Sequence, residues 1–178
     1  THADENAGYL GVALALKYLV EHHSDNAIMD YIYNNVKLSV VPIFNMWGAN
    51  QTPKNREAQD GSAMNRWEVG YLNAEQQILS DYVGSIKDEL SYYIDCHTAE
   101  WWNDYGYVFA IPYPHAKMIP AIVSTANYLC RHWFPNELAL NWNIGKSSSG
   151  MASQSYMAET YDIDAATIEF CGQDLIAF

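Results

Sequence analysis

Four short apolar runs, separated by stretches with helical spacing, constrain the fold of this chain most. The runs have the length and composition of buried strands, and they cover residues 36–44, 92–97, 107–112 and 165–171. Residues 6–23, 75–87 and 120–133 have the pattern of helices, and Asp25 can cap a further, shorter helix that extends to about residue 34. Strands that alternate with helices form mainly parallel sheets covered on both faces. We therefore expect one α/β domain over residues 1–178, with three α/β/α layers and a mainly parallel, mixed sheet.

Composition and charge exclude several kinds of partner. The chain has 178 residues, 49% of them hydrophobic, which is enough for one domain with a sizeable core. Its formal net charge is -12, with nine Lys and Arg residues in total. Nucleic acids and anionic membrane surfaces are bound by clustered Lys and Arg, so we expect neither partner. No apolar run approaches the ~20 residues of a membrane span.

Two polar residues at the start of the first predicted helix suggest a metal site. His2 and Glu5 are three residues apart, which places both side chains on one face of a helix. An imidazole and a carboxylate held together are two of the three protein ligands of a catalytic zinc site. The best candidate for the third ligand is His97, at the end of the run 92–97. The alternative is a pair of solvated residues at a helix start.

A long polar loop follows the first apolar run and carries two arginines. It extends from about residue 45 to Trp67 and contains Arg56, Asn65 and Arg66. Open α/β sheets bind ligands beyond the carboxyl ends of their strands, and long structureless loops in compact domains are usually functional. The alternative is a surface loop with solvated arginines. A second loop, rich in Ser and Gly, is expected at residues 145–150.

One acidic residue lies inside the last apolar run. Glu169 stands in the sequence Thr167-Ile168-Glu169-Phe170. A carboxylate in such surroundings costs several kcal/mol unless it is paired or bound. The pattern therefore predicts either a structural hydrogen-bond partner for Glu169 or a catalytic role. The three cysteines, an odd number without a C-x-x-C spacing, favour neither a disulfide framework nor a cysteine zinc site.

Taken in order, these segments resemble the zinc metallocarboxypeptidases of the M14 family, particularly its bacterial and bacteriophage members. The shared pattern is H-x-x-E, a strand, R-x9-N-R, a strand ending in D-x-H-T, and a strand containing T-I-E-F. Between the first two strands it also matches at Pro42, Asn45, Gly48, Arg56, Gly61, Asn65 and Arg66. The resemblance covers almost the whole chain. It implies a zinc-carboxypeptidase-like α/β/α fold with one Zn²⁺ per chain.

The resemblance also implies roles for individual residues at the metal. His2, Glu5 and His97 resemble the zinc ligands of the family, and Glu169 resembles its general base and acid. The chemistry requires such a set, because zinc with three protein ligands keeps a position for water. A nearby carboxylate then takes the proton of that water and passes it to the leaving amine.

Other residues resemble those of the family that bind the substrate. Arg56 resembles the residue that polarises the scissile carbonyl and stabilises the oxyanion. Asn65 and Arg66 resemble the pair that holds the terminal carboxylate of the substrate, which an Arg can bind in bidentate fashion. The family also has a mobile tyrosine upstream of the catalytic Glu, for which Tyr156 and Tyr161 are the candidates.

Two departures from the family pattern stand out. Family members usually have an Asp two residues before Asn-Arg that supports a zinc-binding His, whereas this chain has Ala63. Loss of such a partner typically costs ~10–100-fold in metal affinity or activity; Asp60 and Asp4 are possible substitutes. The family also has strands before H-x-x-E, so we expect that this chain is an N-terminally truncated catalytic domain.

The sequence thus predicts a zinc-dependent carboxypeptidase that acts on peptides or on cell-wall stem peptides. A catalytically inactive binding or assembly module, part of a surface or phage-tail structure, is one alternative. A related zinc-dependent N-acyl amino acid deacylase is another, although its Arg usually lies closer to the Asn-Arg pair than Arg56 lies to Arg66. A secreted or virion-associated location is expected, and the sequence indicates no oligomeric state.

Overall fold

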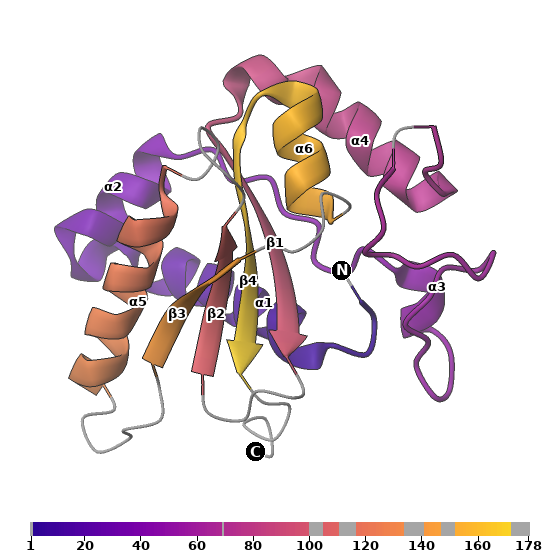
Figure 1. Cartoon of the computed structure of the whole chain (residues 1–178). Helices are drawn as coiled ribbons and strands as arrows, with labels where there is room; N and C mark the ends of the chain where they lie inside the picture. Colours follow the sequence, from indigo (N-terminus) through magenta and orange to yellow (C-terminus); the bar gives the residue numbers. More distant parts are fainter. Residues whose placement is uncertain are drawn as a thin grey trace.

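A four-stranded sheet forms the centre of the molecule (Figure 1). The computed structural model describes residues 2–68, 70–99, 105–110, 117–133, 141–146 and 152–171. The strands are β1 (Tyr92–Ala99), β2 (Tyr105–Ala110), β3 (Asn141–Lys146) and β4 (Asp164–Cys171), in the spatial order β1-β4-β2-β3. β1 runs parallel to β4 and β2 parallel to β3, whereas β2 and β4 are antiparallel. The sheet is therefore mixed and mainly parallel, which confirms the predicted fold class.

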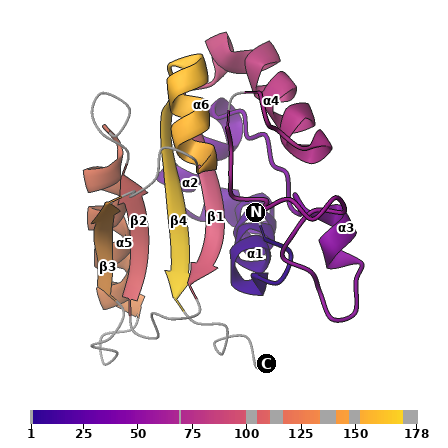
Figure 2. The same ribbon diagram turned by 45° about the vertical axis from the view of Figure 1, so that its right-hand side comes forward.

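Helices cover both faces of the sheet, which gives the predicted three layers. They are α1 (Asn6–His22), α2 (Ala27–Asn35), α3 (Met46–Ala49), α4 (Ala74–Ile86), α5 (Ile119–Trp133) and α6 (Ser153–Tyr161). On one face, Ile119 of α5 packs against Ala166, and Gly11 of α1 lies beside Phe170. On the other face, Ala158 of α6 packs against Ala165. Figure 1 shows α6 in front of β1 and β4 with α1 behind them, and Figure 2 shows the same arrangement turned by 45°.

The main apolar core lies between α6, α4 and the loop that precedes α4. Trp67, Val83, Met157 and Ile163 are all buried in this cluster. Apolar side chains removed from water in this way supply most of the favourable free energy of folding. Within the described residues, no helix is both long and apolar enough to cross a membrane.

The predicted strand at residues 36–44 is wrong. These residues pair with no described strand, and the side chains of Val36, Leu38 and Val41 are 44%, 51% and 51% exposed. Pro42 has no backbone N–H to donate to a neighbouring strand. Phe44 is less exposed than these residues, because its ring stacks on Trp67 with 5.8 Å between the ring centroids. An apolar run of this kind indicates an extended backbone, but it does not say whether a neighbouring strand is present.

The predicted start of the second helix needs correction. The second helix, α2, begins after Asn26, whose side-chain oxygen accepts the N–H groups of Ile28 and Met29 at 3.1 and 2.9 Å. The expected cap, Asp25, instead ends a short 3-10 turn, His23–Asp25.

The strand β3 and the helix α6 were not predicted. Residues 145 and 146, expected in a loop, belong to β3, while residues 147–150 and the predicted strand end at 111–112 lie outside the described residues. The first turn of α6 has polar side chains that are nevertheless buried, namely Ser153, Gln154 and Ser155, each 2% exposed. A helix with a buried polar turn lacks the apolar stripe by which helices are found in a sequence.

Candidate metal centre

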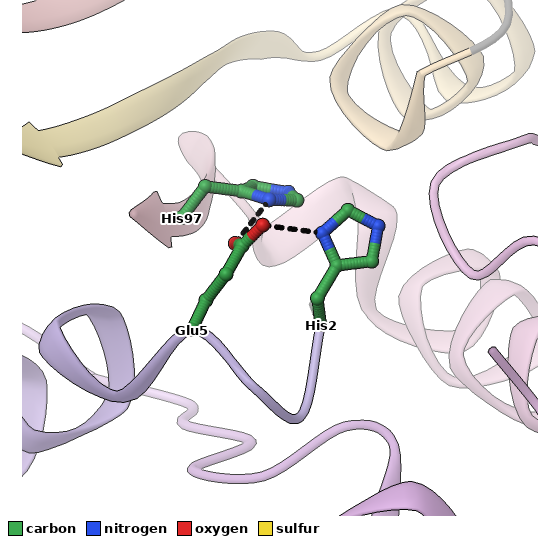
Figure 3. Close-up of side chains that lie close together, drawn as sticks. All are labelled: His2, Glu5 and His97. Atoms are coloured by element: carbon green, nitrogen blue, oxygen red, sulfur yellow. Dashed lines mark hydrogen bonds and ion pairs between the residues drawn. The ribbon is translucent and has the colours of Figure 1, made fainter. Parts of the chain in front are cut away.

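The side chains of His2, Glu5 and His97 converge at the carboxyl end of β1, as the sequence predicted. His2 Nδ1 lies 2.6 Å from Glu5 Oε1, and His97 Nδ1 lies 2.8 Å from Glu5 Oε2 (Figure 3). All three residues are buried, and each can offer a ligand atom within 4.8 Å of the others. Two imidazoles therefore face the two oxygens of one carboxylate.

The start of α1 is anchored to β1, and this brings Glu5 to His97. Glu5 precedes the first turn of α1, and its Oε2 accepts the backbone N–H of Thr98 at 3.1 Å. The hydroxyl oxygen of Thr98 in turn accepts the N–H of Gly8 at 3.1 Å. A Cβ on Gly8 would lie 3.1 Å from the carbonyl oxygen of Cys96, so a side chain there would push the helix away from the strand. The threonine of the D-x-H-T motif and this glycine thus set the position of Glu5.

Asp95 and Ser153 extend the cluster on the other side of His97. Asp95 Oδ2 lies 3.0 Å from His97 Nε2, and the same oxygen accepts a hydrogen bond from the Ser153 hydroxyl. Asp95 and His97 are two residues apart on β1, so their side chains lie on the same face. Neither Asp95 nor Ser153 is predicted as a site residue from the sequence, although Asp95 belongs to the D-x-H-T motif. The D-x-H spacing is the signal that could have identified the aspartate.

Arg56 joins the cluster from the long loop. Its Nη1 atom lies 2.8 Å from Glu5 Oε1 and 3.5 Å from Asp4 Oδ2, while 43% of its side chain is exposed. The guanidinium is therefore half open to solvent while it contacts the carboxylate that both histidines share. An arginine in this place can stabilise negative charge that develops beside the cluster.

Asn45 holds the backbone of the loop that carries Arg56. Its side chain is fully buried, and its Nδ2 donates to the carbonyl oxygens of residues 55, 56 and 57 at 3.3, 3.3 and 2.8 Å. Its Oδ1 accepts the N–H of Gly48 at 2.8 Å. A Cβ on Gly48 would lie 2.1 Å from the carbonyl oxygen of Asn55, so only glycine fits at that position. Asn45 thus positions Arg56 from a distance.

Glu169 lies directly beside His97 across the β1–β4 pairing. The two residues are Cα partners in register and share one face of the sheet. Burial raises the pKa of the Glu169 carboxyl to about 7, and the carboxylates of Glu5 and Asp95 act in the same direction. The positive charges of His97 and Arg56 oppose this rise. A carboxyl group with a pKa near 7 can both accept and donate a proton at neutral pH.

The charges around His97 favour its protonated form. Burial by itself lowers the pKa of His97, but the Asp95 and Glu5 carboxylates outweigh this effect and raise the pKa to about 10. Burial by itself raises the pKa values of Glu5 and Asp95, yet their neighbouring imidazoles hold both well below the usual range. For His2, burial lowers the pKa. A cation at this site therefore competes with a proton on His97 rather than with one on His2.

The predicted carboxylate-binding residues do not contact the cluster in the described structure. Gln76 Nε2 donates to the carbonyl oxygens of Met64 and Arg66 at 3.2 and 2.8 Å, which fixes the loop against α4. Arg66 itself is exposed, and its Nη1 donates to the carbonyl oxygen of Asn65 at 3.3 Å. The backbone of this pair is thus anchored while the guanidinium faces solvent.

Asp60 and Asp4, the two possible substitutes for the missing aspartate, lie at different distances from the cluster. Ala63 is exposed. Asp60 is also exposed, and its Oδ1 accepts the N–H of Ser62 at 2.9 Å, so it stabilises its own turn. Asp4 lies at the cluster, where it forms an ion pair with Arg56. Among the aspartates of the described residues, the one that hydrogen-bonds to a histidine of the cluster is Asp95, at His97.

Tyr156 and Tyr161 point toward α4. The Tyr161 hydroxyl lies 2.6 Å from Ser80 Oγ and donates to the carbonyl oxygen of Ser80 at 2.8 Å. The Tyr156 hydroxyl lies 3.2 Å from the same Oγ atom, and its ring packs against Trp67. No described contact joins either tyrosine to the cluster of His2, Glu5 and His97. A substrate-binding role for them stays a prediction, and the structure gives both a packing role.

Three solved structures resemble this chain over nearly its whole length. They are each named a "putative metallopeptidase", from Shewanella denitrificans, Shewanella amazonensis and Shewanella baltica. Their TM-scores are 0.59, 0.56 and 0.55, and they are 17%, 18% and 16% identical to this chain over 97%, 97% and 96% of its length. This chain shares their fold. It spans 64%, 66% and 65% of their lengths.

Sequence comparison adds no closer relative. No protein-family profile matches the chain, and no curated protein sequence matches it. At the identities of the solved structures, the likeness shows the α/β fold alone. The geometry of the cluster is therefore the main indication of an activity.

Proposed function

We propose that this chain is the catalytic part of a zinc-dependent metallocarboxypeptidase, which removes residues from the free carboxyl ends of peptides. The observation that carries this proposal is the buried cluster of His2, Glu5 and His97 with Arg56 and Glu169 beside it. The structurally similar Shewanella proteins, each named a "putative metallopeptidase", support a metal-dependent peptidase.

The donor atoms of the cluster fit zinc. Two imidazole nitrogens and a carboxylate are the ligand set of many catalytic zinc sites, and here the three groups lie within 4.8 Å of one another. The hydrogen bond from the Thr98 N–H to Glu5 and the Asp95 contact on His97 hold two of these ligands in place. Bound zinc supplies a Lewis acid and lowers the pKa of water to about 7.

Glu169 and Arg56 have complementary tasks in this proposal. Glu169, whose pKa is raised by burial to about 7, accepts a proton from the attacking water and passes it to the leaving amine. Arg56, held by Asn45 through its backbone, lies where its guanidinium can stabilise the negative charge that develops on the scissile carbonyl oxygen.

Recognition of a free carboxyl end falls to Asn65 and Arg66. The Gln76 side chain anchors the loop of this pair, and the exposed Arg66 guanidinium is available to a substrate carboxylate. Either a protein carboxyl terminus or a cell-wall stem peptide carries such a group. The proposal covers both substrates.

Incubation with a mixed peptide library, followed by mass spectrometry, tests this function. We expect losses of single residues from the carboxyl end, which stop after addition of a chelator and return with zinc. Carboxyl-terminally amidated peptides should be poor substrates. Internal cleavage, or unchanged cleavage in the presence of the chelator, would contradict the proposal.

The Arg66→Ala variant tests how the chain end is recognised. It should lose activity mainly on free-acid peptides, through a raised KM. Arg131→Ala, which changes another exposed arginine, on α5, is the matched control and should leave cleavage unaltered. Equal cleavage of acid and amide peptides by the unchanged chain would remove Arg66 from the binding site.

A further inference from the structure

We propose that Asp95, held in place by Ser153, is a positioning residue that sets the ring orientation and tautomer of His97 as a metal ligand. This inference rests on the proposed metal centre. Asp95 then supplies the supporting carboxylate, although the D-x-H spacing is its only signal in the sequence. It also explains how the cluster keeps one well-oriented histidine although Ala63 stands where an aspartate was expected.

The contacts of His97 determine which of its nitrogens can bind a metal. Nε2 lies 3.0 Å from Asp95 Oδ2, and Nδ1 lies 2.8 Å from Glu5 Oε2. An ionised carboxylate can only accept hydrogen bonds. Asp95 therefore keeps the N–H of a neutral imidazole on Nε2, which leaves the lone pair on Nδ1 directed into the cluster.

The position of Asp95 is itself fixed from a different element. Ser153 is the first residue of α6, is 2% exposed, and donates its hydroxyl hydrogen to the same Oδ2 atom that faces His97. Asp95 is 7% exposed, so little water competes for this oxygen. The orientation of His97 therefore depends on the docking of α6 against β1.

The two histidines of the cluster are supported unequally. In the part of the chain that the structure describes, no side chain hydrogen-bonds to the His2 ring other than Glu5, at Nδ1. The expected aspartate that would support a histidine from the Asn-Arg loop is replaced by Ala63, which is exposed. His97, by contrast, has a buried carboxylate at its second nitrogen. We infer that His97 is the preorganised ligand of the pair.

Zinc affinity, measured by competition with a chelator, tests this role separately from catalysis. Asp95→Asn keeps the size of the side chain but removes its charge, and should weaken zinc binding by ~10–100-fold. Ser153→Ala should weaken it in the same direction by a smaller factor, because Asp95 still faces His97. Ser155→Ala is the matched control, since Ser155 lies in the same turn of α6 and is equally buried at 2% exposure; its zinc affinity should be unaltered.

Two further measurements separate positioning from folding. The melting temperature of each chelator-treated variant reports its stability without zinc. If the Asp95–Ser153 pair were purely structural, the substitutions would lower this melting temperature and leave zinc affinity unaltered. In zinc-loaded protein labelled with ¹⁵N-histidine, the His97 Nε2–H signal should be protected from exchange, and Asp95→Asn should remove that protection. If Asp95→Asn does not fold, both measurements can be made on Ser153→Ala instead.

The outcomes distinguish this inference from the proposed function. Unaltered zinc affinity in both Asp95→Asn and Ser153→Ala, in a chain that binds zinc, would overturn the inference and leave the metal centre standing. Failure of the unchanged chain to bind zinc would overturn both. A loss of affinity in Ser155→Ala equal to that in Ser153→Ala would show an effect of the helix turn and not of the hydrogen bond to Asp95.

Discussion

The first turn of α6 and its remaining turns bury their side chains in different ways. At the start of the helix, Ser153 donates to the buried Asp95 of the polar cluster. Further along, Met157 is fully buried in the apolar core, and Tyr161 places its hydroxyl on Ser80 of α4. One short helix therefore contributes to a charged, hydrogen-bonded centre and to a core held mainly by apolar burial.

This difference separates two sources of free energy. The cluster consists of buried ionisable groups, whose energies depend on protonation and on a bound cation. The core depends on apolar area removed from water, which responds to side-chain volume and hardly to pH. Substitutions in the cluster should therefore change zinc binding or turnover, whereas substitutions in the core should change stability.

The largest expected effect is on turnover, from Glu169→Gln. The variant keeps the shape of the side chain but cannot accept a proton, and general-base help is commonly worth ~10²–10⁴-fold in rate. Peptide turnover should fall by that range, while zinc content stays near one per chain and the melting temperature changes little. The structural alternative predicts the reverse, a lower melting temperature with unaltered turnover per folded molecule.

In the core, Met157→Ala should lower the free energy of unfolding by about 2–5 kcal/mol, because it leaves a cavity at a residue with no exposed surface. Urea unfolding measures this change. Zinc affinity of the folded fraction should stay the same, since Met157 packs in the apolar cluster of α4 and α6. A large loss of zinc affinity in this variant would show that packing of the core and zinc binding at the cluster are not independent.

The pH dependence of the cluster sharpens the comparison further. Asp95 and Glu5 outweigh burial and raise the pKa of His97 from 6.5 to about 10, so zinc must displace a proton below that pH. Zinc affinity should rise ~tenfold per pH unit between about pH 7 and about pH 9. The lower limit is set by Glu169, whose carboxyl group has a pKa of about 7 and also titrates below that pH. Chelator competition at several pH values measures this slope, and Met157→Ala should show the same slope as the unchanged chain.

The same pKa shift predicts how the chelator-treated protein responds to pH. A folded-state pKa above the unfolded value gives stability that is fully present below about pH 6.5 and is lost as the pH rises through about 10. Its melting temperature should therefore fall across this window. A constant melting temperature from pH 6.5 to 10 would show that His97 has no such stabilising partners.

The smallest expected effect comes from Tyr161→Phe. This change removes a hydroxyl that contacts Ser80 at 2.6 and 2.8 Å, and it should lower the free energy of unfolding by about 0.5–1.5 kcal/mol. Zinc affinity and KM should stay unaltered, because no described contact links Tyr161 to the cluster. A raised KM with unaltered stability would restore the substrate-binding role predicted from the sequence.

Local spacing in the sequence was enough to find most of the elements. The helices α1, α4 and α5 and the strands β1 and β4 begin and end within two residues of their predicted bounds. Side chains that share one face of a helix or strand recur at a fixed interval, so their pattern is readable without the fold. The three-residue spacing of His2 and Glu5, together with the family resemblance, predicted that they meet His97, and the three side chains do lie together.

Only the tertiary structure decided which distant groups meet. Asp95 and Ser153 are 58 residues apart, and their hydrogen bond exists because α6 packs on the face of β1 that carries His97. The exposure of residues 36–42 and the placement of Tyr161 against α4 were decided in the same way. A residue type and its neighbours in sequence determine local conformation, whereas burial and hydrogen-bond partners depend on the packing of elements that the sequence separates.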